Sequence, residues 1–242
     1  MAHVPRVYVP GRIARGRLSI AGDSARHLQS VLRVRHGDPL LLFSGDGREW
    51  SASVLETTRQ AVVVTVGEQT RMEAAAPLML EVWIALVRAQ RLDWAIEKVT
   101  EAGADIIRPL VTHHASRGDT AGQSRQDRWQ RIAVEAAEQS GRLFLPVIEA
   151  PIAFDAALAR PGVALYIADG AGIPWSEAAR LLPARGAVAL AVGPEGGFSD
   201  DEIARAKSRG AVAVSLGPNV LRTETAALAG VALFRGALPN RT

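Results

Sequence analysis

Short apolar runs alternate with Pro and Gly turns over the first 66 residues, a pattern that is typical of successive β-strands. The predicted strands cover residues 6–9, 18–20, 39–43, 50–55 and 61–66. One stretch, residues 24–34, instead spaces its apolar side chains at roughly helical intervals, so we expect a helix there. Together these elements favour a small β-barrel over residues 1–70.

The pattern changes after residues 67–77, a polar and then proline-ended segment that predicts a linker. From residue 78 onward, strand-like runs alternate with helical ones. The predicted strands are 80–86, 105–110, 163–168, 187–192 and 211–216, and the predicted helices are 92–102, 124–140, 176–182, 200–209 and 224–235. Such alternation predicts an α/β domain over residues 78–242 with a mostly parallel sheet. Trp83, Trp94 and Trp129 are expected in its core.

Two loops near the C-terminal end contain Gly-Pro and share one arrangement. Residues 191–198 read AVGPEGGF, and residues 215–225 read SLGPNVLRTET. Each follows a predicted strand and precedes a predicted helix, where an open α/β sheet binds its ligand, so the loops predict one small-molecule pocket. Ser199 and Glu202 form a capping-box pattern that places a helix start at Asp200. Ordinary strand-to-helix turns are the alternative.

The positive charge is concentrated at the N-terminal end. The net charge is +3, and the first 75 residues hold 10 Arg against 7 acids, while the remainder is balanced. Within the first 35 residues, seven arginines face a single acid, Asp23. A basic segment of this kind favours a phosphate-bearing partner such as nucleic acid, with a merely solvated surface as the alternative.

Other compositional features exclude several classes. The chain has no cysteine, which rules out disulfides and thiolate metal sites and suits a cytosolic protein. Residues 1–17 carry four arginines and no apolar core, unlike a signal peptide, and no apolar run reaches the roughly 18 to 20 residues of a membrane span. His113 and His114 are adjacent on a predicted strand end and lack partners at zinc spacing, so we expect no metal.

The chemistry of the loops narrows the ligand. Neither loop has the phosphate-binding pattern of a P-loop or of a dinucleotide fold. Between Gly193 and Ser199 there is one acid, Glu195, and no base. Because a carboxylate beside a phosphate is unfavourable, a nucleoside without phosphates fits better. S-adenosylmethionine, an adenosine that carries a cationic sulfonium, is such a ligand.

Several motifs in order along the chain carry a family resemblance. They are PRxY from residue 5, HxxxVLR from 27, EKxxExG from 97, AEQSGR from 137, GPEGG from 193 and LGPxVLRTETA from 216. This set closely resembles the 16S ribosomal RNA (uracil-N3)-methyltransferases, the RsmE family of the SPOUT class. The resemblance implies a PUA-like RNA-binding barrel (1–70), a SPOUT methyltransferase domain (78–242) with a trefoil knot, and a homodimer.

The resemblance also implies that S-adenosylmethionine binds at the two loops and at a neighbouring strand end. The expected cofactor-binding residues are Ile167, Ala168, Ala191, Gly193, Gly197, Leu216, Gly217, Val220 and Leu221. Methylation at N3 requires loss of the uracil proton, so the site must stabilise an anionic base. Arg222 is the candidate for this role because a guanidinium donates in fixed geometry, with an ion pair to Glu195 or Glu224 as the alternative. Either acid is a candidate general base, although Glu224 also suits a helix N-terminus.

The expected RNA contacts lie mainly in the barrel. The candidates are Arg6, Tyr8, His27, Arg33, Arg35 and Arg142. The arginines and the histidine would contact phosphates, which position RNA more than they specify sequence. Tyr8 could stack on a base or be a half-buried strand residue. Arg142 would line the catalytic cleft with the end of its helix.

Two departures from the family pattern stand out: Asn219 replaces a common Arg, and His113-His114 replaces a usual Glu-Arg. The resemblance makes 16S rRNA, or the 30S subunit, the expected partner in the cytoplasm. One alternative is a SPOUT enzyme that methylates a ribose 2′-oxygen or another base. The other is a non-catalytic RNA-binding factor of ribosome assembly.

Overall fold

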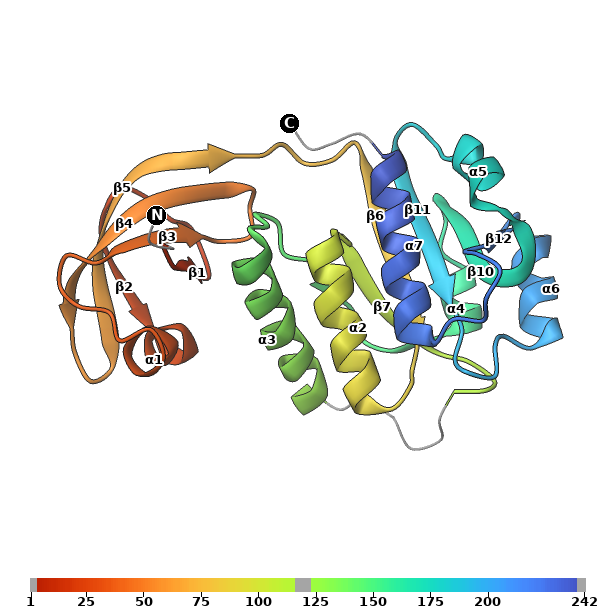
Figure 1. The fold of residues 1–242 in the computed structure, drawn as a ribbon, viewed down its shortest axis with the longest axis horizontal. Helices are drawn as coiled ribbons and strands as arrows, with labels where there is room; N and C mark the ends of the chain where they lie inside the picture. The colour runs from red at the N-terminus through yellow and green to blue at the C-terminus, as the bar shows by residue number, and fades with distance from the viewer. Residues whose placement is uncertain (1–3, 116–122, 239–242) are drawn as a thin grey trace. The chain divides into compact units, whose positions relative to one another are not determined.

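The computed structural model describes residues 4–115 and 123–238, and the chain divides into two compact units. The first unit contains the chain up to Ala75 together with Ala137–Leu145. The second contains Ala76–Ala136 and the chain from Pro146 onward. Figure 1 shows the ribbon with its elements labelled. Within the described ranges, no helix combines the length and apolarity that crossing a membrane requires.

The first unit is a five-stranded sheet with one helix, α1 (Gly22–Ser30). Its strands are β1 (Arg6–Tyr8), β2 (Gly16–Ala21), β3 (Pro39–Phe43), β4 (Arg48–Thr57) and β5 (Ala61–Met72). They lie in the order β1-β3-β4-β5-β2, and the sheet curls around a core that includes Leu28, Leu42 and Val64. All five predicted strands are therefore confirmed: β2, β4 and β5 are longer than predicted, β3 has the predicted bounds, and β1 is one residue shorter.

Two predicted boundaries in this unit are wrong. Strand β5 continues through the first part of the predicted linker because it pairs with β4 as far as Arg48 opposite Met72. Helix α1 ends at Ser30 instead of residue 34, and Arg33 adopts a left-handed backbone with φ of 51°. That turn lets Val34 enter the core and leaves Val31 exposed at the surface.

The second unit has a sheet of seven strands, all paired in parallel. Its strands are β6 (Leu78–Ala85), β7 (Ile106–Val111), β8 (Val147–Ile148), β9 (Ile152–Ala153), β10 (Val163–Pro174), β11 (Gly186–Val192) and β12 (Val212–Ser215). Its helices are α2 (Ala89–Ala102), α3 (Gln123–Ser140, whose end joins the first unit), α4 (Phe154–Leu158), α5 (Trp175–Ala178), the 3-10 turn η1 (Ala179–Leu181), α6 (Asp200–Ser208) and α7 (Thr223–Ala237). The predicted α/β class and parallel sheet are confirmed.

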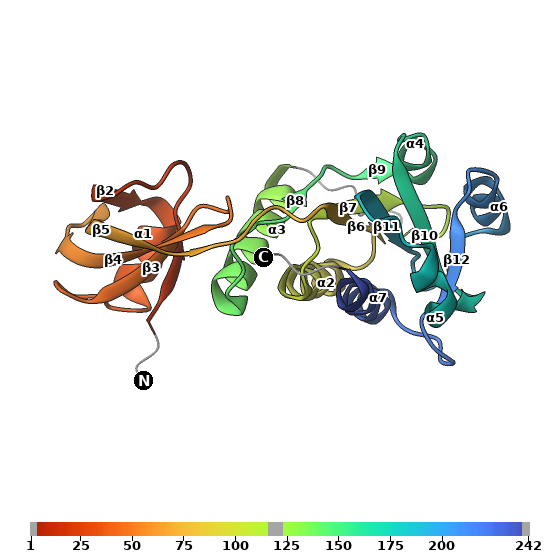
Figure 2. The ribbon, with the colours of Figure 1, turned by 90° about the horizontal axis from the view of Figure 1, so that it is seen from above.

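The two faces of this sheet are covered by different helices: α2 and α7, together with α3 and α5, pack on one face, and α4 and α6 pack on the other (Figure 2). Alternation along the strands supplies both faces, because Leu190 packs under α7 while its neighbours Ala189 and Ala191 face the other cluster. Trp83 and Trp129 are buried as predicted, but Trp94 is exposed at 39% on α2, so its predicted core position is wrong.

The strand order places the two Gly-Pro loops side by side. The path β12-β10-β11-β6-β7-β8 sets β10 between β11 and β12, and both pairings are parallel. The carboxyl ends of β11 and β12, at Val192 and Ser215, therefore meet at one edge of the sheet. Strand β10 is irregular there, because its register against β12 shifts between Ala168 and Ile173.

The irregular part of β10 contains Gly172, whose packing allows a direct test. A Cβ at Gly172 would lie 2.4 Å from the backbone nitrogen of Val214 and 2.5 Å from the carbonyl carbon of Ala213, whereas a Cβ at Gly170 would meet nothing within 4 Å. We expect Gly172→Ala to lower the free energy of unfolding by about 1–3 kcal/mol, measured by denaturant titration. Gly170→Ala is the matched control and should change it little. Equal stability of the two variants would contradict the packing of β10 against β12.

Candidate functional site

A pocket of about 490 Å³ lies where β10, β11 and β12 end. It is lined by residues 168–170, by most of residues 192–198, by residues 215–221, and by Ile203, Thr223 and Ala226. Its volume is within the range of small-molecule sites. The two Gly-Pro loops thus form one pocket, as the sequence predicts.

Most of the residues expected to bind a cofactor line this pocket. They are Ala168, Gly193, Gly197, Leu216, Gly217, Val220 and Leu221. Ile167 and Ala191 do not line it: they pair with each other across β10 and β11 and are 1% and 0% exposed. Their side chains belong to the core beneath the pocket and do not form its wall, so their binding to the cofactor stays a prediction.

The pocket wall also includes residues that the sequence reasoning did not select. Ile203 comes from α6, and Thr223 and Ala226 come from the first turn of α7. The hydroxyl of Thr223 donates a hydrogen bond of 2.9 Å to the carbonyl oxygen of Gly193. This bond ties the start of α7, after the second loop, to the first loop. The position of Thr223 directly before the predicted helix 224–235, where a Thr side chain is a common cap, is the sequence signal that could have indicated it.

The first loop is also supported from α6 and from the turn after β7. The predicted capping box is confirmed, since Ser199 accepts from the backbone of Glu202 and the Glu202 carboxylate accepts from the backbone of Ser199. Glu202 is buried and also accepts a 2.9 Å hydrogen bond from the backbone nitrogen of His113. His114 places Nδ1 3.1 Å from the carbonyl oxygen of Gly197, so Nδ1 is the donor. Through these hydrogen bonds, His113 and His114 connect the turn after β7 to α6 and to the first Gly-Pro loop.

The charges in the pocket wall have one sign. Asp169 and Glu195 line it, and none of the described lining residues is Lys or Arg. Such a wall favours a cation and disfavours a phosphate. Among the described residues, no group of three or more His, Asp or Glu is placed to hold a metal ion.

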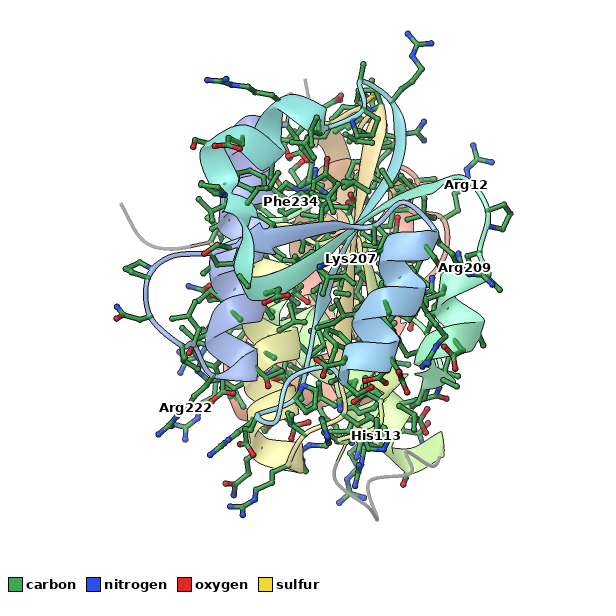
Figure 3. All side chains as sticks on the ribbon, turned by 90° about the vertical axis from the view of Figure 1, so that its right-hand side faces the viewer. Arg12, His113, Lys207, Arg209, Arg222 and Phe234 are labelled. Atoms are coloured by element: carbon green, nitrogen blue, oxygen red, sulfur yellow. The ribbon has the colours of Figure 1, made fainter. Side chains whose placement is uncertain are left out.

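The three predicted catalytic residues occupy different positions around the pocket. Glu195 lines it, while Arg222 is the exposed N-cap of α7, directly between Leu221 and Thr223 of the wall. Figure 3 shows Arg222 and His113 at the same end of this unit, near the starts of α7 and α6. In the part of the chain that the structure describes, the Arg222 side chain makes no ion pair. The alternative pairing of Arg222 with either acid is not found there.

Both acids instead pair with Arg91 of α2, a residue that the sequence reasoning missed. Its guanidinium forms an ion pair with Glu195 and lies 3.9 Å from Oε1 of Glu224. Glu224 is in the first turn of α7 and does not line the pocket. No motif or spacing connects Arg91 to these acids, because the contact arises only when α2 packs against α7.

The RNA-binding candidates in the first unit fall into two groups. His27, Arg33 and Arg35 are exposed. Arg6 is not, with 9% of its side chain exposed, because it donates to Glu49 at 2.8 Å and to the carbonyl oxygen of Ala137 at 2.8 Å. This burial conflicts with the predicted phosphate contact, since the guanidinium holds the end of α3 against the sheet.

Tyr8 and Arg142 belong to the same internal junction. The Tyr8 ring is partly buried and meets Phe43 edge to face, with centroids 5.8 Å apart. Its backbone nitrogen donates to the Glu138 carboxylate at 2.8 Å. Arg142 is half-buried, and its carbonyl oxygen accepts from Arg6 at 3.2 Å. Of the two alternatives for Tyr8, the structure shows the half-buried strand residue.

Each of the two units contains a sequence that matches a family model of RNA methyltransferases. A family model described as RNA methyltransferase domain matches residues 74–235, and one described as RNA methyltransferase PUA domain matches residues 20–67. The chain is 32% identical to ribosomal RNA small subunit methyltransferase E of Synechocystis sp., covering 97% of this chain and 78% of the relative. The Bacillus subtilis protein of the same name is 30% identical, with 87% and 86% covered.

The chain belongs to the ribosomal RNA small subunit methyltransferase E family. The resemblance drawn from the ordered motifs along the chain is therefore confirmed, and with it the class of enzyme, an rRNA methyltransferase. A family member from Neisseria gonorrhoeae, solved bound to S-adenosyl methionine, superposes with a TM-score of 0.87 at 28% identity, covering 98% of both chains. A Legionella pneumophila protein solved with the bound cofactor SAM has a TM-score of 0.86 at 31% identity and the same coverage.

Gly217, at the start of the second loop, offers a test of the pocket. Its φ is +139°, and it lines the pocket, so valine would introduce both backbone strain and bulk there. We expect Gly217→Val to lower the affinity for S-adenosylmethionine at least about tenfold, measured by calorimetry. Gly186→Val is the matched control, because Gly186 has a φ of +103° but does not line the pocket. If both variants lose affinity equally, strain and not pocket geometry is responsible.

Proposed function

We propose that this protein transfers a methyl group from S-adenosylmethionine to N3 of one uridine in 16S rRNA of the small ribosomal subunit. The observation that carries the proposal is a pocket built from two Gly-Pro loops, lined by Asp169 and Glu195 and by no described cation. That chemistry suits a sulfonium nucleoside. Membership of the family supports the rRNA substrate.

Residues of both loops would hold the cofactor. Gly197 and Gly217 have positive φ and expose backbone to the pocket, while Leu216 and Leu221 supply apolar contacts. When bound, S-adenosylmethionine supplies an electrophilic methyl group on its positively charged sulfur. The carboxylates of Asp169 and Glu195 make the pocket compatible with that charge.

Arg222 would act on the uracil. It is exposed and lies between two pocket-lining residues, Leu221 and Thr223, so its guanidinium can reach the pocket mouth. Donation to a uracil carbonyl oxygen would stabilise the anion that forms when N3 loses its proton. Glu195 is the better-placed of the two candidate bases, because it lines the pocket and is about half exposed, whereas Glu224 is set back in α7.

Exposed basic residues of the first unit would bind the RNA. His27, Arg33 and Arg35 are the proposed phosphate contacts, and Arg6, Tyr8 and Arg142 are left out because they form the internal junction. The partner would be 16S rRNA or the 30S subunit, which implies a cytoplasmic protein. We also propose a homodimer, as the family resemblance implies, and the fully exposed Val220 and the exposed Trp94 supply apolar surface for it.

Nucleoside analysis tests the reaction directly. We expect N3-methyluridine to disappear from the small-subunit rRNA of a strain that lacks this gene, and to return on complementation, as measured by mass spectrometry. An unchanged N3-methyluridine peak would contradict the proposal. Loss of a 2′-O-methyl nucleoside or another methylated base would instead identify a different target. If calorimetry detects no binding of S-adenosylmethionine, the protein is a non-catalytic RNA-binding factor.

Arg222→Ala separates cofactor binding from chemistry. We expect the variant to bind S-adenosylmethionine normally and to lose about 100-fold or more in kcat, because a donor to the developing anion is removed. Methyl transfer to rRNA or to purified subunits provides the rate. Arg180→Ala is the control, since Arg180 is an exposed arginine of η1 outside the pocket. Normal methylation by Arg222→Ala would refute its catalytic role.

The proposed phosphate contacts of Arg33 and Arg35 predict that substituting either residue changes how RNA affinity depends on salt concentration. We expect Arg33→Gln and Arg35→Gln each to weaken RNA binding and to reduce the slope of log K against log salt by about 0.7 to 1, because each removes one phosphate contact. Arg26→Gln is the control, because Arg26 already pairs with Asp23 at 2.5 Å on the same unit. Slopes equal to that of the wild type would place the RNA elsewhere.

A further inference from the structure

Arg91 connects three separate segments at the edge of the pocket. It lies in the first turn of α2, and its guanidinium meets one carboxylate of the first Gly-Pro loop and another of α7. Glu195 pairs with the terminal Nη1, while Oε1 of Glu224 lies 3.9 Å from Nε. Arg91, which belongs to neither loop, therefore lies beside two carboxylates at the site, those of Glu195 and Glu224.

The burial of the three side chains indicates that Arg91 is needed for charge balance. The side chain of Glu224 is 13% exposed, and its Oε2 atom is buried without a hydrogen-bond partner in the described residues. A carboxylate in that position depends strongly on a nearby cation. Arg91 is itself 29% exposed, so its interaction with the acids is only partly screened by water.

The balance of charge at the pocket follows from these contacts. Asp169 and Glu195 line the pocket and Glu224 is adjacent to it through Thr223, which gives three acids. Arg91 compensates two of them and does not itself line the pocket. The negative potential inside the pocket is therefore set by how strongly Arg91 offsets these carboxylates.

This potential acts differently on the two forms of the cofactor. In methyl transfer, the bond from sulfur to the methyl carbon breaks and sulfur keeps its electron pair. N3 of the uracil anion forms the new bond to carbon, after its proton has passed to the general base, for which Glu195 is the better-placed candidate. S-adenosylmethionine carries a positive sulfur, whereas the product S-adenosylhomocysteine has a neutral thioether. A change of one charge near the pocket must therefore shift the two affinities unequally.

We propose that Arg91 is a specificity-determining residue that sets the ratio of the affinities for the cationic cofactor and its neutral product. This inference rests on the proposed function. By compensating Glu195 and Glu224, Arg91 reduces the negative potential to a level at which cofactor still binds and exchanges readily with product. Without Arg91, the pocket would favour the cation further.

The test is the ratio of the two dissociation constants, measured by calorimetry with S-adenosylmethionine and S-adenosylhomocysteine. We expect Arg91→Gln to shift this ratio in favour of S-adenosylmethionine by about three- to tenfold, from the Coulomb energy of one partly screened charge. Glu195→Gln should shift it by a similar factor in the opposite direction. Arg91→Lys retains the charge and should restore most of the wild-type ratio.

The outcomes separate the charge effect from a structural one. If Arg91 only holds the loops in place, Arg91→Gln will weaken both ligands equally and leave the ratio unchanged, which would overturn the inference alone. Glu195 is 56% exposed, so Glu195→Gln reports on the charge even if Arg91→Gln does not fold. Wild-type protein that binds neither ligand would overturn the proposed function and this inference together.

Discussion

The site depends on one constraint, the parallel pairing of β10 with β11 on one side and with β12 on the other. Parallel strands end at the same edge, so the loops after β11 and β12 meet although a helix separates them along the chain. The hydrogen bond from Thr223 to Gly193 then fixes the second loop to the first. The register of β10 against β12 shifts between Ala168 and Ile173, and residues 168–170 at this irregularity form the third wall of the pocket.

The charge of the pocket follows from the same arrangement. The loops contribute no described cation to the wall, so Asp169 and Glu195 determine its sign. The negative charge of Glu195 is compensated by Arg91 on α2, which does not line the pocket. A wall with two acids and no described cation disfavours phosphate, in contrast to the loops of nucleotide-binding α/β proteins, which surround phosphate with backbone amides and basic side chains.

Features that depend on neighbours in the sequence could be predicted from it. The Gly-Pro turns, the capping box at Ser199 and the alternation of strands and helices are all local patterns, and they located the pocket. Features that depend on tertiary contacts could not. Arg6 and Arg33 look alike in a basic segment, but only Arg6 meets Glu49 and a helix end and becomes buried. Arg91 likewise acquires its role only through the packing of α2 on α7.

The account is tested most directly by a crystal structure of this protein with S-adenosylmethionine. We predict that the adenosine lies between the two loops, in contact with residues 193–197 and 216–221, with the sulfonium on the side of the pocket where Glu195 lies. A cofactor bound outside these loops, or one whose sulfonium points away from the carboxylates of Asp169 and Glu195, would contradict the account.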